Sequence, residues 1–128
     1  MKLPMVILAS ALASFGAAPQ STPVAADKDV AELAGRTAGK PQRCVSVKPG
    51  QLFSTSDSNP NLLLYDDGKT IWVSDVGPNC GFESGESAIP DESASYYCKG
   101  DIVRPGSRIT LLPFGRHCAL RDFTPYRK

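Results

Sequence analysis

After residue 43, short apolar runs alternate with turn residues along the chain, a pattern typical of a protein built from short β-strands. The β-branched run Cys44–Val47 is followed by Pro49-Gly50, and the polar stretch 54–61 separates it from the next apolar run. Short runs bounded by Gly, Pro, Asn and Ser indicate strands joined by turns. We therefore expect an all-β domain, a small antiparallel barrel or sandwich of about five to seven short strands.

The clearest element is a hairpin formed by residues 62–65 and 70–76. Between them lies Asp67-Gly68, a preferred two-residue turn because both central positions need positive φ. That turn predicts two opposite pairs on one face, which we assign to the core: Leu62 with Val73 and Leu64 with Ile71.

The second face of this hairpin is also apolar, since it carries Leu63, Tyr65 and Trp72. A solvated face would be polar. Either another part of the chain covers this face, which is the interpretation we favour, or it is a contact surface. Trp72 and Tyr65 are therefore candidate binding residues.

The second half of the domain has weaker signals. Residues 83–95 are acidic and Ser-rich without periodicity, and they predict a mobile loop. Pro105-Gly106 predicts a turn. A last hairpin is expected from 108–112 and 116–123, around Phe114-Gly115.

The N-terminus has the pattern of a secretory signal peptide in residues 1–26. Lys2 supplies the basic start and Met5–Ala18 the apolar segment. Cleavage after Ala26 leaves a better new N-terminus than cleavage after Ala18, which would expose a proline; both sites stay open.

The rest of the chain divides into two parts. Residues 27–43 form a linker or a short helix, in which Asp27 or Asp29 could be the cap and Val30 has helical spacing to later apolar residues. Residues 44–128 form the β-domain, which is a single domain by length.

All four cysteines lie in this part of the chain, at positions 44, 80, 98 and 118. An export signal with an even number of cysteines predicts disulfides in an oxidising compartment, here the periplasm or the exterior. Among the three possible pairings we favour the nested one, Cys44–Cys118 with Cys80–Cys98. No Cys-x-x-Cys pair or nearby His favours zinc.

Charge is balanced overall but uneven along the chain. The 128 residues carry 14 basic and 13 acidic side chains. Such neutrality argues against general nucleic-acid binding, which needs a basic field. Residues 57–92 are strongly acidic and residues 99–128 strongly basic. These segments pair with each other, the interpretation we favour, or the basic one forms a patch for an anionic envelope component.

Candidate chemistry is sparse. His117 is the only histidine, no Gly-x-Ser-x-Gly motif is present, and no glycine-rich phosphate loop occurs. The acids of the turns and loops (Asp66, Asp67, Asp75 and Glu83) are more typical of turn caps than of a hydrolase pair. The Asp57-Ser58-Asn59 segment lacks the spacing of a calcium loop. We predict no cofactor, no metal and no catalytic residue.

Basic and aromatic residues near the C-terminus are better candidates for binding. Asp101 opens an apolar strand after Cys98, where backbone donors or Arg104 could satisfy its carboxylate. Arginine binds carboxylates and phosphates bidentately. The candidate binding residues of this region are Asp101, Arg104, Arg108, Arg116, Arg121 and Tyr126.

Several stretches carry a resemblance: Leu33–Arg36, Gly39–Pro41, Asp66-Asp67-Gly68, Cys80, Cys98–Val103, Cys118–Leu120 and Phe123–Tyr126. On these residues, which span most of 30–127, the chain resembles an uncharacterised family of small secreted, cysteine-containing proteins from alphaproteobacteria. The resemblance implies a secreted β-domain with paired cysteines, and it implies no activity.

Together these features favour a non-enzymatic binding or structural module of the cell envelope, with an anionic envelope component or a protein as partner. The first alternative is an inhibitor of a secreted lysozyme or protease, which would present a loop such as 83–95. The second is a small hydrolase. No segment after the signal peptide is apolar enough to span a membrane.

Overall fold

The computed structural model describes residues 30–91 and 95–128, and its strands pair antiparallel. The predicted signal peptide and the caps Asp27 and Asp29 lie outside the described residues. The helical elements within them are two short 3-10 turns, η1 (Ala31–Leu33) and η2 (Pro78–Cys80). Among the described residues, no helix has the length and apolar character needed to cross a membrane.

The predicted all-β class is confirmed. The strands are β1 (Thr37–Ala38), β2 (Cys44–Ser46), β3 (Ser54–Thr55), β4 (Leu62–Asp66), β5 (Thr70–Asp75), β6 (Glu86–Pro90), β7 (Tyr96–Cys98), β8 (Ile102–Ser107), β9 (Cys118–Ala119) and β10 (Thr124–Arg127). They outnumber the five to seven that the sequence predicts, because several contain only two or three residues and leave no periodic signal.

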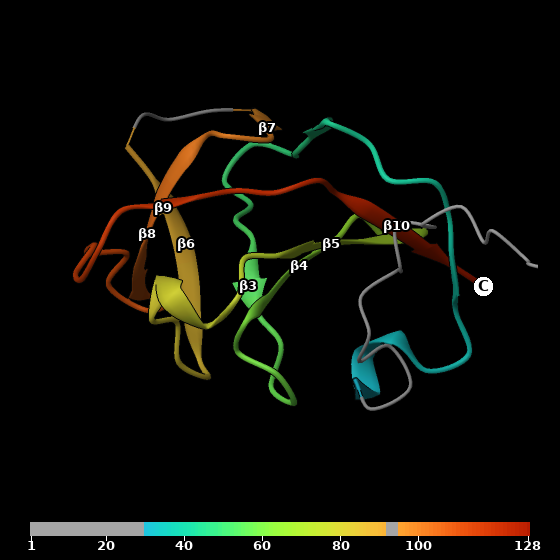
Figure 1. Ribbon diagram of the computed structural model, residues 1–128, viewed down its shortest axis with the longest axis horizontal. Helices are drawn as coiled ribbons and strands as arrows, with labels where there is room; N and C mark the ends of the chain where they lie inside the picture. Colours follow the sequence, from blue (N-terminus) through green and yellow to red (C-terminus); the bar gives the residue numbers. More distant parts are fainter. Residues whose placement is uncertain (1–29, 92–94) are drawn as a thin grey trace, which may run out of the picture.

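Eight strands form one sheet in the order β1-β10-β5-β4-β3-β6-β8-β9, and β2 pairs with β7 separately. The short strand β3 connects the two halves of the sheet, because Ser54 pairs with Leu64 of β4 and with Ser87 of β6. In Figure 1, β6 and β8 run steeply on one side of β3, while β4, β5 and β10 run along the other.

Two clusters of buried side chains hold these elements together. The main cluster packs both halves of the sheet against the β2–β7 ribbon. Its members are Val45, Val47, Phe53, Leu63, Tyr65, Trp72, Val76, Phe82, Ala88, Tyr97, Val103, Cys118, Leu120 and Phe123. The second cluster lies on the opposite face of β4 and β5: Val30, Leu33, Leu62, Ile71, Val73 and Tyr126. Both faces of this hairpin are therefore buried.

The hairpin register differs from the predicted one by two residues. Leu64 lies opposite Val73, and Asp66 lies opposite Ile71. The turn is centred one residue later than expected: Gly68 has φ 99°, and the Asp67 N–H donates to the Thr70 carbonyl (3.0 Å). A shift of two residues leaves each side chain on its predicted face.

The predicted mobile loop 83–95 is wrong in its centre, since β6 occupies Glu86–Pro90 and pairs with β3 and β8. Its polar side chains are buried with partners. The Glu86 carboxylate accepts the N–H of Glu83 (2.7 Å), and Ser87 Oγ bonds to Ser54 Oγ (3.0 Å). A strand that buries Glu and Ser has no apolar alternation to detect.

The predicted turn at Pro105-Gly106 and the last hairpin are also wrong. Both residues lie inside β8, opposite Ala88 and Ser87 of β6. Gly106 is needed for close approach: a Cβ there would lie 2.5 Å from Ile89 Cγ1 and 2.9 Å from the Leu112 carbonyl oxygen. The strand β8 ends at Ser107, and residues 108–117 connect it to β9.

Two disulfides form as predicted, but the nested pairing is wrong. Cys44 bonds to Cys98 and Cys80 bonds to Cys118, so the two covalent loops interleave. The nested pairing assumed that the first and last strands are neighbours. Instead β2 pairs with β7, which sets Cys44 opposite Cys98, and the last strand β10 lies between β1 and β5.

Candidate interaction surface

The segment between β8 and β9, residues 108–117, exposes most of the large apolar side chains that the described residues leave in solvent. We call it the β8–β9 loop. The exposed fractions are 92% for Ile109, 51% for Leu111, 67% for Leu112 and 49% for Phe114. Contiguous exposed apolar side chains on a small protein indicate an interaction site, whereas scattered ones need no explanation.

Hydrogen bonds within the loop hold it in this exposed form. Ser107 Oγ accepts the N–H groups of Ile109 (3.1 Å) and Thr110 (3.3 Å), and the Ser107 carbonyl accepts the N–H of Leu111 (2.9 Å). Phe114 N–H donates to the Pro105 carbonyl (2.8 Å). The loop thus has its own backbone partners while its apolar side chains point outward.

Leu111 has a backbone conformation that leucine rarely adopts. Its φ is 57°, in the left-handed region, and it is the one non-glycine residue of the described chain with positive φ. Such a conformation costs about 1–2 kcal/mol for a residue with a Cβ. Strained residues of this kind gather at functional sites.

The surroundings of the loop are basic. From Ile102 to Arg121 the sequence has four arginines and neither Asp nor Glu. Arg108 and Arg116 stand at the two ends of the loop, and both are exposed. Arg104, which is half-buried, donates from Nη2 to the Gly115 carbonyl (3.2 Å) and supports the second end.

Two of the predicted arginines reach the same segment. Arg116 lines a groove of about 420 Å³ together with Phe114 and the η2 residues. A Cβ added to Gly77, which directly precedes η2, would lie 3.8 Å from Arg121 Nη2. Arg116 and Arg121 therefore converge beside η2.

Arg108 belongs to a different part of the surface. Its Nη2 donates to the Thr55 carbonyl (2.8 Å), and it lines a groove of about 550 Å³ that also includes Arg36 and Asp57. The expected convergence of all the arginines on one side is thus seen only for part of the set.

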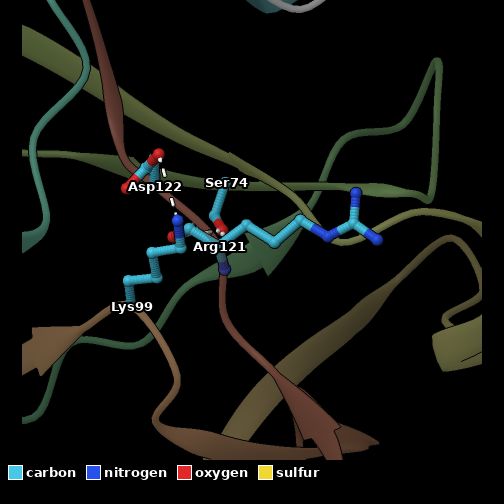
Figure 2. Close-up of polar contacts among 4 residues, drawn as sticks. All are labelled: Ser74, Lys99, Arg121 and Asp122. Atoms are coloured by element: carbon cyan, nitrogen blue, oxygen red, sulfur yellow. Dashed lines mark hydrogen bonds and ion pairs between the residues drawn. The ribbon is translucent and has the colours of Figure 1, made fainter.

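Figure 2 shows how Ser74 holds the backbone of Arg121. Ser74 Oγ, fully buried, donates to the Arg121 carbonyl (3.2 Å) and accepts its N–H (3.1 Å). Lys99 forms an ion pair with Asp122 (3.6 Å), and the Arg121 side chain points away from that pair.

The expected pairing of the acidic segment with the basic one is limited among the described residues. The ion pair between them joins Asp91 to His117 (3.6 Å), and both side chains are about half exposed or more, at 51% and 61%. The other ion pair, Lys99–Asp122, lies within the basic segment. Among the described residues, the four arginines between Ile102 and Arg121 therefore form no ion pair with a carboxylate, although Glu32 and Asp57 line the same groove as Arg108.

The aromatic candidate residues Trp72, Tyr65 and Tyr126 are buried. Trp72 is 8% exposed and Tyr65 lies in the same main cluster. Trp72 Nε1 donates to Asp67 Oδ2 (3.3 Å), and the Arg127 guanidinium lies 5.9 Å from the indole centroid. Tyr126 is fully buried in the second cluster. The covered interpretation of the hairpin is confirmed.

Asp101 is satisfied locally by the backbone. Its Oδ2 accepts the N–H of Cys98 (2.7 Å), which is one of the two explanations that the sequence offered. Burial, with the nearby charge of Asp101, raises the pKa of the Tyr97 hydroxyl above its usual range.

Three of the four turn and loop acids act as caps. Asp66 Oδ1 accepts the N–H of Gly68 (2.8 Å) and Asp75 Oδ1 accepts that of Gly77 (3.0 Å). Asp67 Oδ1 accepts the amides of Lys69 (2.9 Å) and Thr70 (2.7 Å). Burial alone would raise the pKa of Asp67, but these amides, the Trp72 indole and the charge of Lys48 together hold its pKa below its usual range.

Metal-binding residues do not gather in the described part of the chain. No group of three or more His, Cys, Asp or Glu side chains is placed there to hold an ion. In the segment that hinted at calcium, Asn59 Oδ1 accepts the N–H of Asn61 (3.1 Å), and Ser56 Oγ accepts the N–H of Ser58 (3.1 Å). These oxygens serve the backbone of the loop.

Neither a protein-family model nor a curated protein nor a solved structure matches this chain.

Sequence reasoning found the arginines of this surface but missed its apolar part. It placed Ile109, Leu111 and Leu112 in a strand of the last hairpin, because a short apolar run is consistent with a buried strand. One signal was present: Pro113 and Gly115 interrupt the run, and the arginines at both ends leave little alternation. Those features fit a loop better than a strand.

Proposed function

We propose that this protein is a non-enzymatic binding module of the periplasm that attaches to the cell envelope through its β8–β9 loop. The observation that carries the proposal is the outward projection of Ile109, Leu111, Leu112 and Phe114 from a hydrogen-bonded loop. Removing apolar surface from water is favourable by about 25 cal/mol per Å². A partner that covers these side chains gains that free energy without first ordering the loop.

The basic ends of the loop favour an anionic partner. Arg108 and Arg116 flank the apolar side chains, and no carboxylate occurs between Ile102 and Arg121. Envelope components rich in phosphate or carboxylate groups complement this arrangement, because arginine binds both groups bidentately. Attachment should therefore depend on apolar contact and on salt.

The proposed compartment rests on the cysteines. Both disulfides are formed and no free cysteine is present among the four. Such a state fits an oxidising compartment, either extracellular or periplasmic. The predicted signal peptide and the resemblance to small exported proteins support the periplasm as the more specific assignment.

The loop that the inhibitor alternative requires, residues 83–95, is replaced at its centre by a strand. Residues 83–95 were to present the inhibitory tip, but β6 occupies their centre and Glu86–Ala88 are buried. The hydrolase alternative needs a pair of acidic residues, and three of its four candidates accept backbone N–H groups in turns: Asp66, Asp67 and Asp75. We therefore develop only the envelope module.

Sedimentation with isolated cell envelopes tests the proposal. The exported protein, with its disulfides intact, should sediment with envelopes at low salt and be released partly at high salt. The variant Leu112→Ser should bind at least several-fold more weakly. Its matched control is Tyr96→Ser, which removes an exposed aromatic side chain from β7.

Two results would overturn the proposal. One is a protein that ignores envelopes at every salt concentration. The other is equal binding by the parent protein and Leu112→Ser, because the attachment would then not use the β8–β9 loop.

A further inference from the structure

We infer that the partner of the β8–β9 loop is the surface of an anionic lipid bilayer, into which the loop inserts its apolar side chains. This inference rests on the proposed function and specifies its partner. Ile109, Leu111, Leu112 and Phe114 would enter the boundary between headgroups and acyl chains, while Arg116 would bind lipid phosphates.

The first argument is the shape of the surface. The apolar side chains belong to one continuous loop, and Ile109 is 92% exposed, so the protein provides almost no walls around it. A stable protein–protein interface buries about 800 Å² on each partner, with close shape complementarity. A bilayer needs no such complementarity, and a protruding loop suits it well.

The second argument is the order of residues in the loop. Arg108 precedes the apolar side chains and Arg116 follows them. Interfacial segments bury an apolar part about 5–10 Å into the headgroup boundary and keep basic side chains at the phosphate level. The Arg116 side chain is long enough to extend to that level while the backbone lies deeper. The Arg108 guanidinium instead donates to the Thr55 carbonyl (2.8 Å).

The third argument is charge. The stretch from Ile102 to Arg121 carries four arginines without an acid, and the exposed Arg116 and Arg121 of this stretch would attract anionic lipid. Among the described residues, Asp91, which lies 3.6 Å from His117, is the carboxylate that pairs with this stretch. Arg116 and Arg121 both lie beside η2 and extend the basic area away from the loop.

The fourth argument is the rigidity of the loop. Ser107 accepts three backbone N–H groups, and Leu111 keeps its left-handed conformation with φ 57°. A loop that is already ordered loses little conformational entropy on insertion. The same hydrogen bonds would hold the backbone polar groups when the loop enters a less polar medium.

Vesicle co-sedimentation tests this inference. The exported protein is mixed with vesicles of phosphatidylcholine alone, and with vesicles of phosphatidylcholine and phosphatidylglycerol in equal parts. We expect binding to the anionic vesicles, at least several-fold weaker binding to the neutral ones, and release from the anionic ones by salt.

Three variants separate the contributions. Leu112→Ser and Phe114→Ser should each weaken binding to anionic vesicles about tenfold, because each removes an apolar side chain that inserts. Arg116→Gln should weaken it about fivefold. Arg116 serves better than Arg108 because Arg108 also donates to the Thr55 carbonyl.

The matched controls lie outside the loop. Tyr96→Ser removes an exposed aromatic side chain, and Arg43→Gln removes an exposed arginine. Both should bind vesicles like the parent protein. The thermal unfolding of every variant is measured, so that weaker binding by a misfolded protein is recognised.

Several outcomes would overturn the inference. Equal binding by the loop variants and the parent protein would do so, as would absence of binding to anionic vesicles. If envelopes still bind the protein through Leu112 while vesicles do not, the proposed function stands and the lipid partner is wrong; a protein or glycan then covers the loop. If Leu112→Ser converts a dimer to a monomer, the occupant is a second copy of the chain.

Discussion

The β4–β5 hairpin and the β8–β9 loop are both rich in large apolar residues, yet the protein treats them in opposite ways. The hairpin buries Trp72 at 8% exposure between two clusters, whereas the loop leaves Ile109 at 92%. The hairpin is covered by segments far from it in sequence: β10 pairs with β5, and η1 contributes Leu33 to the second cluster. In the part of the chain that the structure describes, no remote segment covers the loop to that extent.

This contrast teaches that apolar content alone does not tell a core element from a contact surface. In the hairpin, the apolar residues lie on both faces of two strands that a capped turn at Asp67 connects. In the loop, Pro113 and Gly115 break the run and Ser107 bonds to the loop backbone. The first set stabilises the fold, and we propose that the second set contacts a partner.

Truncation of one aromatic residue in each region should give the largest difference. Trp72→Ala should lower the free energy of unfolding by about 3–5 kcal/mol, because it leaves a cavity in the main cluster. Phe114→Ala should change it by about 0.5 kcal/mol or less, as exposed positions do. Urea unfolding of both variants measures the difference. Equal effects would show that the loop is part of the core.

Removal of the disulfide that ties η2 to β9, by Cys80→Ala with Cys118→Ala, should come next. The chain-entropy model gives a loss of about 4 kcal/mol for a loop of this length, and measured losses are often smaller. Urea unfolding measures the loss. Mass mapping of the unreduced parent protein should yield linked peptides for Cys44–Cys98 and Cys80–Cys118. A linked Cys44–Cys118 peptide would contradict the fold.

Relief of the backbone strain in the loop should have a small and opposite effect. Leu111→Asn should raise the free energy of unfolding by about 0.5–1 kcal/mol, since Asn adopts the left-handed conformation more readily. Leu112→Asn is the matched control and should leave stability unchanged. Thermal unfolding compares the two. Destabilisation by Leu111→Asn would mean that this leucine packs in solution.

The smallest expected effect is a pH dependence set by the hairpin turn. Asp67 has a pKa below the ordinary aspartate value of 3.8 in the folded protein. Its stabilising contribution is therefore complete above pH 3.8 and is lost as the pH falls through the lower, folded-state value. Unfolding measured from neutral pH down to about pH 2 should show a shallower decline for Asp67→Asn. If the free energy of unfolding of Asp67→Asn fell with pH as steeply as that of the parent protein, the Asp67 carboxylate would not cause the pH dependence.

Much of the fold follows from local signals in the sequence. The Asp-Gly turn and the apolar runs on either side of it identify the hairpin and its two faces. The two-residue shift in register does not follow from them. The all-β class and the formation of disulfides also follow. For these features the physical cause lies within a few residues, so the sequence displays it.

The remaining features depend on distant partners. β6 buries Glu86 because the Glu83 amide meets its carboxylate, and Thr55 Oγ1 donates to the Glu86 carbonyl (3.2 Å). The disulfide pairing depends on which strands are neighbours in the sheet. The exposure of the β8–β9 loop depends on what fails to cover it. None of these can be read from a local pattern.

The account is tested most directly by hydrogen exchange of the exported protein, alone and bound to isolated envelope membranes. The β8–β9 loop is the claimed contact, so backbone amides of residues 108–117 should exchange more slowly in the bound protein. The β4–β5 hairpin should be unchanged. Protection of another surface with an unchanged loop would contradict the account.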